Sequence, residues 1–61
     1  MSNNELVDID YDEIVTSTDD AFLFSIEDKS IWISKSLIDD HDEYNKNFTI
    51  PEWLAYKEEL I

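Results

Sequence analysis

Residues 21–38, AFLFSIEDKSIWISKSLI, decide the fold, because they hold most of the apolar side chains that can form a core. Apolar residues recur at every second position in 22–26, which is the period of a β-strand. A second apolar run, 31–33, follows the polar residues 27–30. The pattern predicts a central β-hairpin over about 21–34, with the other segments packed around it.

The expected turn of this hairpin is residues 28–29. With that turn, Phe24 lies opposite Ile33 and Ser25 lies opposite Trp32. Paired residues share a face, so one face of the hairpin is predicted to be wholly apolar and the other mixed. Two-residue turns favour Gly or Asn, and the chain has no glycine, so a longer, open loop is the alternative.

Residues 5–15, ELVDIDYDEIV, predict a further strand with one buried and one acidic face. The buried side carries Val7, Ile9 and Tyr11, and the acidic side carries Asp8, Asp10 and Asp12. Residues 48–50 predict a short extended segment before Pro51, which suits the first position of a helix because no N–H is needed there.

A C-terminal helix is expected over about 51–60, and one of its sides should cover the apolar face of the hairpin. That side carries Trp53, Leu54, Lys57, Leu60 and Ile61. The predicted fold class is α+β: a small antiparallel sheet of three to four strands, with the central hairpin at about 21–34, covered by the C-terminal helix. We expect a single domain over 1–61, with 1–4 flexible.

Size and composition narrow the class of protein. An apolar content of 43% is too high for a disordered chain. A domain of 61 residues buries a small share of its surface, and without cysteine it has no disulfide, so association is the remaining source of stability. The N-terminus has no signal-peptide pattern, and no stretch reaches the roughly 20 apolar residues of a membrane span. These features predict a cytoplasmic location.

Charge is the strongest compositional feature. Sixteen acidic residues against four lysines give a net charge of −12. Such a surface repels nucleic acids and anionic membranes and attracts basic surfaces. The predicted partner is therefore a basic protein or protein complex, with no direct nucleic acid and no membrane. The alternative is that the charge only keeps a small, apolar-rich protein soluble.

The acidic row of residues 8–12 has three interpretations. Its carboxylates are expected about 6.6 Å apart, a spacing of the same order as that of successive phosphates in a nucleic-acid strand, so the row could imitate one. It could instead be the solvated face of an edge strand. The pattern also echoes a calcium-binding loop, but Glu13 stands where that loop needs glycine.

Residues 39–47, DDHDEYNKN, predict a second acidic segment, a solvated loop available for contact with a basic partner. His41 lies among these carboxylates and is a candidate metal ligand, but sequential neighbours in a loop rarely converge on one ion. The predicted partner-binding residues are Asp8, Asp10, Asp12, Asp39, Asp40, Asp42, Glu43 and Trp32. We predict no catalytic residues, cofactor or metal, and no enzyme activity, because a domain this small has little room for a water-excluding pocket.

Trp32 and Leu23 fall on the mixed face of the hairpin. The favoured expectation is burial against Val7, Ile9 or Tyr11. An exposed contact patch of the kind found at interface centres is the second option, and a homodimer through this face is the third.

Two motifs, SIWISKSLI and IPEWLAYKEEL, resemble a pattern of short, mostly uncharacterised phage and prophage proteins. In that pattern a hairpin ends in a Trp-Ile-Pro-Lys-Ser-x-Ile corner and a Glu-Trp-Leu-Ala-x-Lys helix closes the chain. Ser34 replaces the proline here, and no glycine precedes Leu60. The resemblance covers about 40 residues and implies phage origin, and with it the cytoplasm of a bacterial host.

Together, charge and resemblance predict a small acidic phage-type protein that inhibits a host protein. The expected target is a nucleic-acid-binding defence component, so the inhibitor would be of the anti-CRISPR or anti-restriction type and would act as a nucleic-acid mimic. The alternative is a homo-oligomeric accessory protein of phage replication, recombination or assembly.

Overall fold

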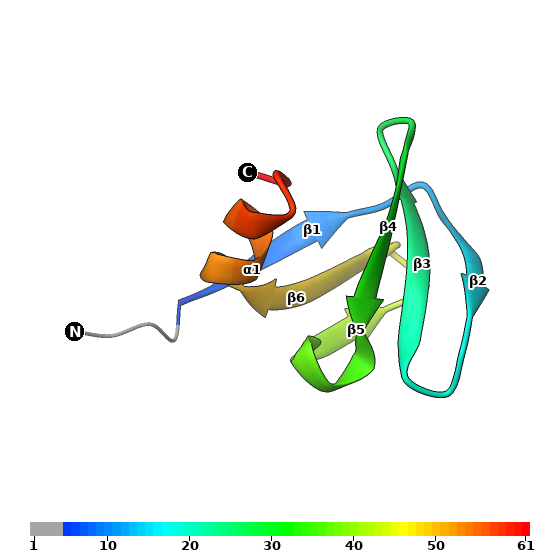
Figure 1. Cartoon of the computed structure of the whole chain (residues 1–61), viewed down its shortest axis with the longest axis horizontal. Helices are drawn as coiled ribbons and strands as arrows, with labels where there is room; N and C mark the ends of the chain where they lie inside the picture. Colours follow the sequence, from blue (N-terminus) through cyan, green and yellow to red (C-terminus); the bar gives the residue numbers. More distant parts are fainter. Residues whose placement is uncertain (1–4) are drawn as a thin grey trace.

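The computed structural model describes residues 5–61, so the expected flexibility of 1–4 lies outside the described residues. It is an α+β fold of two three-stranded antiparallel sheets and a C-terminal helix, which confirms the predicted class (Figure 1). The elements are β1 (Leu6–Asp10), β2 (Glu13–Ser17), β3 (Ala21–Ile26), β4 (Lys29–Ser34), the 3-10 helix η1 (Lys35–Leu37), β5 (Asp40–Asp42), β6 (Asn47–Pro51) and α1 (Glu52–Lys57).

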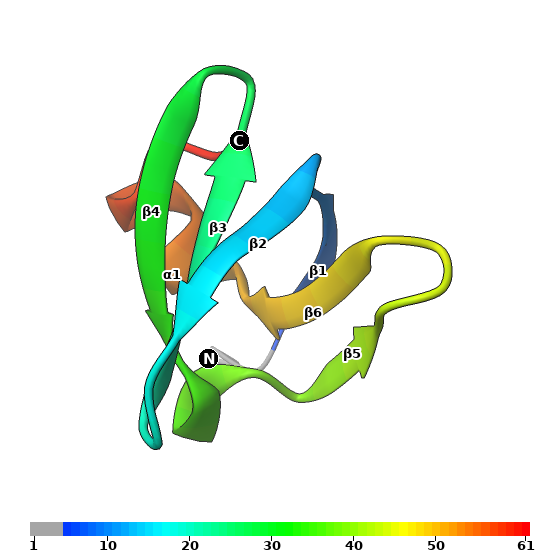
Figure 2. The same cartoon turned by 90° about the vertical axis from the view of Figure 1, so that its right-hand side faces the viewer.

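Sheet A has the strand order β1-β6-β5, and sheet B has the order β2-β3-β4 (Figure 2). The expectation of three to four strands in one sheet was therefore too low. Residues 39–47, expected as a loop, contain the short strand β5 and the start of β6. Both are drawn into sheet A, because β6 is the central strand to which β1 and β5 pair.

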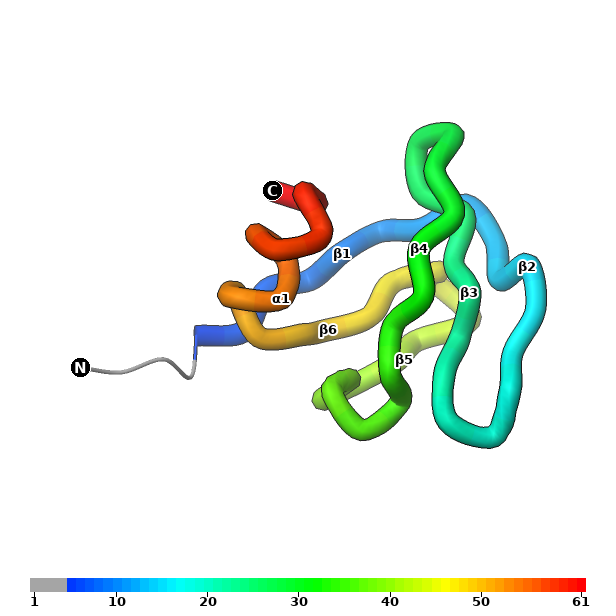
Figure 3. The backbone as a smooth tube through the Cα atoms, in the orientation of Figure 1, coloured from blue at the N-terminus to red at the C-terminus, as the bar shows by residue number. Residues whose placement is uncertain are grey.

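The single strand predicted over 5–15 is wrong, because the chain changes sheets in its middle (Figure 3). The amide of Tyr11 donates to the Lys46 carbonyl at 2.9 Å, beside sheet A. The next amide, of Asp12, donates to the Ser25 carbonyl at 2.7 Å, in sheet B. The alternation of apolar and polar residues runs through this exchange without a break, so the sequence carries no local signal of it.

The core lies between the two sheets. Phe24 from β3 and Phe48 from β6 are both 0% exposed, and their rings stack with centroids 4.3 Å apart. Tyr11, at the junction of the sheets, packs against Phe24 at 4.7 Å and against Phe48 at 6.0 Å. The other buried apolar residues are Ile9, Ile26, Ile31, Ile33, Ile50, Leu54 and Ala55. Leu37 and Ile38 pack against this core.

The predicted hairpin is confirmed, but its turn lies one position earlier, at Glu27–Asp28. Phe24 is paired with Ile31, not with Ile33. Each pairing is displaced by two residues, so every side chain keeps its predicted face and the apolar face points into the core. The open-loop alternative is wrong: the turn has two residues, with φ of 49° and 71°, the conformation for which Asn and Gly are preferred.

The C-terminal helix is shorter than predicted. Pro51 keeps an extended backbone, with ψ of 145°, and ends β6 as the helix N-cap instead of beginning the helix. The helix ends at Lys57, after which the amide of Leu60 donates to the Ala55 carbonyl at 2.8 Å. Glu59 takes φ of 62° in this motif, in the place where glycine is usual.

The predicted buried side of the helix is wrong in part. Leu54 and Ala55 are buried, and the helix packs on β6 and β1 rather than mainly on the hairpin. Trp53 is 50% exposed instead of buried. Because β6 leads directly into the helix, the first turn is held against sheet A, and this determines which side faces the core.

The favoured burial of Trp32 is also wrong. Trp32 is 50% exposed, and its cross-strand partner Leu23 is half-buried. Ile9 and Tyr11, two of the residues expected to cover them, point into the core between the sheets instead. The outer face of sheet B therefore carries an exposed tryptophan.

The hairpin turn supplies the first test. Replacing Asp28 with glycine should raise the free energy of unfolding by about 0.5 to 1 kcal/mol, because removal of the side-chain clash at positive φ outweighs the added entropy of the unfolded chain. Replacing Ser25, inside β3, with glycine should lower the free energy of unfolding. Urea denaturation measures both. Destabilisation by D28G would contradict the left-handed geometry of the turn.

Candidate functional site

The outer face of sheet A gathers acidic residues from two segments that are far apart in sequence. Asp8 of β1 and Asp40 of β5 are both paired with Thr49 of β6, so these three residues form one row across the sheet. Asp10 and Asp42 are both paired with Asn47 and form a second row. Side chains in a row point to the same face, so four of the predicted partner-binding carboxylates share one surface.

The arrangement sets the spacing of the charges. Residues two apart on a strand are separated by about 6.6 Å, and strands two apart in a sheet by about 9.6 Å. Four carboxylates at these distances leave room for polar but uncharged side chains between them. Thr49 and Asn47 occupy that central strand, so no cation interrupts either row.

Hydrogen bonds hold two of the four carboxylates in place. The Thr49 hydroxyl donates to Asp8 Oδ1 at 2.6 Å. The backbone amide of Asn45 donates to Asp42 Oδ1 at 3.0 Å, and its side-chain amide donates to Oδ2 at 2.7 Å. These bonds to Asn45 are the main reason that the pKa of Asp42 lies below its usual value. Asp42 therefore stays negatively charged to a lower pH than an aspartate with the usual pKa.

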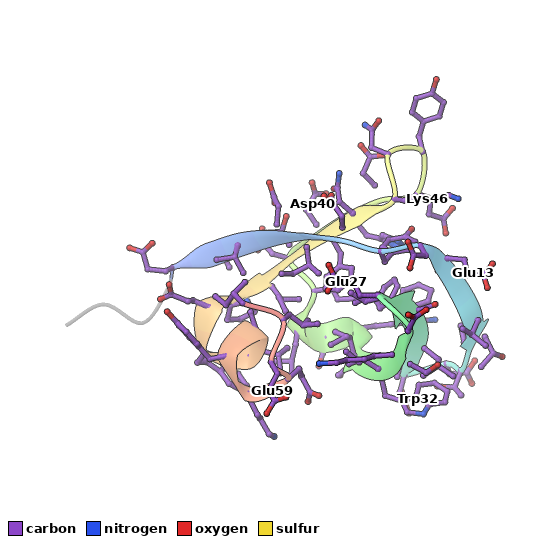
Figure 4. The ribbon with its side chains drawn as sticks, turned by 90° about the horizontal axis from the view of Figure 1, so that it is seen from above. Glu13, Glu27, Trp32, Asp40, Lys46 and Glu59 are labelled. Carbon is purple, nitrogen blue, oxygen red and sulfur yellow. The ribbon has the colours of Figure 1, made fainter. Side chains whose placement is uncertain are left out.

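The other predicted partner-binding residues lie elsewhere. Asp39 and Glu43 are exposed at the two ends of β5. Asp12 lies at the junction of the sheets, where its carboxylate accepts the Glu27 amide at 3.2 Å. Trp32 lies on the opposite side of the molecule from Asp40, so it does not share the acidic face (Figure 4).

A cleft of about 340 Å³ borders the edge of β1 and extends the acidic surface. Asp8 and Asp10 line it together with acids from the junction of the sheets, from the hairpin turn and from the segment after α1. These additional acids are Asp12, Glu27 and Glu59. The one cation among the residues that line the cleft is Lys29, whose ammonium lies 4.0 Å from the Glu59 carboxylate. Because both side chains are well exposed, this ion pair contributes little to stability.

His41 is a packing residue. It is paired with Phe48 on the inner side of β5, and its ring lies 5.1 Å from that of Phe22. The hydroxyl of Tyr11 and His41 Nε2 are 2.9 Å apart. Burial, followed by the charges of Glu43 and Asp42, raises the pKa of Tyr11, so this phenol stays neutral.

The calcium interpretation fails on geometry, because Asp8 and Asp10 lie in a strand and not in a loop that can wrap an ion. Among residues 5–61, no three His, Asp or Glu side chains are placed to share a metal ion. In the same part of the chain, no helix has the length and apolar character needed to cross a membrane.

Thr49 and Asn47 were missed as members of the site. Their alternation with Phe48 and Ile50 in NFTI is the period of a half-buried strand and could have placed them on an outer face. Their neighbours could not be found in this way, because strand order is not a local property.

Comparison with protein family models, curated proteins and solved structures finds no match to this chain.

Asn45 provides a test of the acidic face. Replacing it with alanine should raise the pKa of Asp42 part of the way toward 3.8, because the side-chain amide bond to Oδ2 is lost while the backbone amide bond to Oδ1 is kept. A carboxyl group whose pKa is lower in the folded chain than in the unfolded chain stabilises the folded state at pH values above the unfolded pKa. This contribution is lost as the pH falls through the folded pKa. The variant should therefore be less stable than the wild type at pH 7, and the difference should disappear well below pH 3.8.

NMR titration of the side-chain carboxyls measures the pKa directly, and N47A is the matched control. Asn47 is the cross-strand neighbour of Asp42 but makes no hydrogen bond to its carboxylate. An Asp42 pKa that is unchanged in N45A, or equally raised in both variants, would contradict the assigned side-chain hydrogen bond from Asn45.

Proposed function

We propose that this chain is a small acidic binding protein of phage type that inhibits a host protein in the bacterial cytoplasm. It acts by occupying a basic, nucleic-acid-binding surface as a nucleic-acid mimic. The observation that carries the proposal is the convergence of Asp8, Asp10, Asp40 and Asp42 on the outer face of sheet A.

The geometry of that face supports mimicry. Lysine and arginine side chains that bind phosphates form equally strong, charge-assisted hydrogen bonds with carboxylates. The separation of about 6.6 Å between carboxylates along a strand is of the same order as that of successive phosphates. A rigid sheet presents these charges without the entropy loss that a flexible acidic tail incurs on binding. Hence the outer face of sheet A is the surface we assign to the partner.

Net charge determines which partners are compatible. With −12 on 61 residues, long-range attraction speeds encounter with a basic protein and opposes contact with nucleic acid or anionic lipid. The resemblance to phage proteins makes a defence component, as in anti-CRISPR or anti-restriction inhibition, the favoured target class. The chain needs no cofactor or catalytic step in this role.

A second function is favoured by a different observation. Several large apolar side chains are exposed, including Trp32, Trp53 and Val15, at about half of their surface each. Exposed aromatics are typical of interface centres. A homo-oligomeric accessory protein of phage replication, recombination or assembly would use these side chains, and its acids would serve only solubility.

Substitutions of aspartate by asparagine, which remove charge and keep the size of the side chain, separate the two functions. A partner captured from bacterial lysate and then purified should bind the D8N/D40N variant at least about tenfold more weakly than the wild type, because two of the four carboxylates of the face are lost. The matched control is D19N/D20N, which removes the same charge from the exposed turn between β2 and β3. This control should bind nearly as well as the wild type.

Ionic strength gives the second readout. Affinity of the wild type should fall steeply between low and high salt, because exposed charges are screened. Affinity that does not change with salt, or equal weakening by the two variants, would contradict the mimic mechanism. Circular dichroism would verify that each variant keeps its fold.

A further inference from the structure

Strand β4 is an edge of sheet B, and within residues 5–61 it pairs only with β3 (Figure 2). Residues that flank a two-residue hairpin turn form a hydrogen-bonded pair, and such pairs then alternate along the strands. The backbone groups of Lys29, Ile31 and Ile33 therefore point toward β3. Those of Ser30, Trp32 and Ser34 point to the open edge, where they leave donors and acceptors for another strand.

The sequence of this edge is unusual in a chain of net charge −12. Residues 29–38 form its longest stretch without an acidic residue, and they contain two of its four lysines. Most of the surface repels a second copy of the same chain, and this edge repels it least. In addition, residues 29–35, KSIWISK, read identically in both directions around Trp32.

Trp32 adds apolar surface at the centre of the edge. Its side chain is 50% exposed, on the outer face of sheet B. Leu23 is its cross-strand partner, and Val15, also 50% exposed, is the unpaired residue of a bulge in the next strand. A regular edge strand with an exposed tryptophan at its centre and no acidic residue can serve as a template for pairing with another strand.

We propose that β4 pairs with β4 of a second copy, antiparallel and with the two-fold axis at Trp32. The two Trp32 side chains then lie opposite each other, Ile31 lies opposite Ile33, and Ser30 lies opposite Ser34. The inner faces of both copies stay on the same side of the joined sheet. The three outward residues of each copy supply about six hydrogen bonds between the backbones.

The ends of the pairing limit its strength without preventing it. Lys29 lies opposite Lys35 of the second copy, and like charges in that position are unfavourable. However, Glu59 lies 4.0 Å from the Lys29 ammonium, and the Lys35 ammonium lies 4.7 Å from the centre of the Phe22 ring. The Glu59 carboxylate offsets part of the Lys29 charge, which reduces the repulsion between the two cations.

Pairing at β4 leaves the acidic face of sheet A free, because Trp32 and Asp40 lie on opposite sides of the molecule (Figure 4). The two interactions respond to salt in opposite directions. Screening weakens binding to a basic partner, whereas it strengthens association of two bodies that each carry −12. The dimer is therefore independent of the proposed inhibition of a basic partner, and failure of one leaves the other standing.

Light scattering after size-exclusion chromatography, over a series of concentrations at low and high salt, tests the dimer. We expect a mass that rises from that of the 7.2 kDa chain toward twice that value, more readily at high salt. W32K should raise the dissociation constant at least about tenfold, because two ammonium groups then meet at the axis. W53K is the matched control, with the same substitution at a tryptophan of equal exposure on α1, and it should dimerise as the wild type does.

Amide hydrogen exchange of the wild type gives a readout that needs no variant. Protection of Ser30, Trp32 and Ser34 should increase with protein concentration, whereas that of Ile31 and Ile33 should already be high in the monomer. A monomer under all conditions would overturn the proposal. A dimer that W53K disrupts but W32K does not, or one without concentration-dependent protection at the edge, would overturn it equally.

Discussion

The contact between the rings of Phe24 and Phe48 joins the two halves of this protein. Each residue is the fully buried centre of one sheet, and their ring centroids are 4.3 Å apart. A chain of 61 residues without cysteine has no covalent cross-link to hold two small sheets together, and a three-stranded sheet with one uncovered apolar face has little stability of its own. The aromatic contact, extended by Tyr11, provides the surface that each sheet must bury.

The acidic face follows from this contact. Because the inner positions of sheet A, including Ile9, Phe48 and Ile50, fill the core, the alternate positions of the same strands must face solvent. In β1 and β5 those positions include Asp8, Asp10, Asp40 and Asp42, and in β6 they include Thr49 and Asn47. Two acidic segments separated by about half the chain thus meet on one surface, and the packing of the core determines where they meet.

Local pattern predicted the faces of strands well and their partners poorly. The period of two placed Phe24 and Ile31 on the buried face of the hairpin even though the predicted turn was one position late, because a displacement of two residues conserves the faces. It could not show that the chain leaves sheet A after Tyr11, since the exchange of partners depends on Lys46 and Ser25, which are distant in sequence.

The same limit applies to the site and to the helix. Asp8, Asp10, Asp40 and Asp42 were predicted as partner-binding residues, but only the strand order shows that they share a face and that Trp32 is on the opposite side. The buried side of the helix was predicted in part, because its orientation is set by the strand that precedes it. Leu54 is buried as expected, and Trp53 is not.

A double-mutant cycle on Phe24 and Phe48, each replaced by leucine, tests the central contact most directly. Leucine keeps the sites apolar, and the cycle cancels the contacts that each ring makes with other residues such as Tyr11. Unfolding free energies from urea denaturation should be non-additive by about 0.5 to 1.5 kcal/mol, the range for a direct aromatic pair. Additive effects, equal within about 0.3 kcal/mol, would contradict a structure in which this contact joins the two sheets.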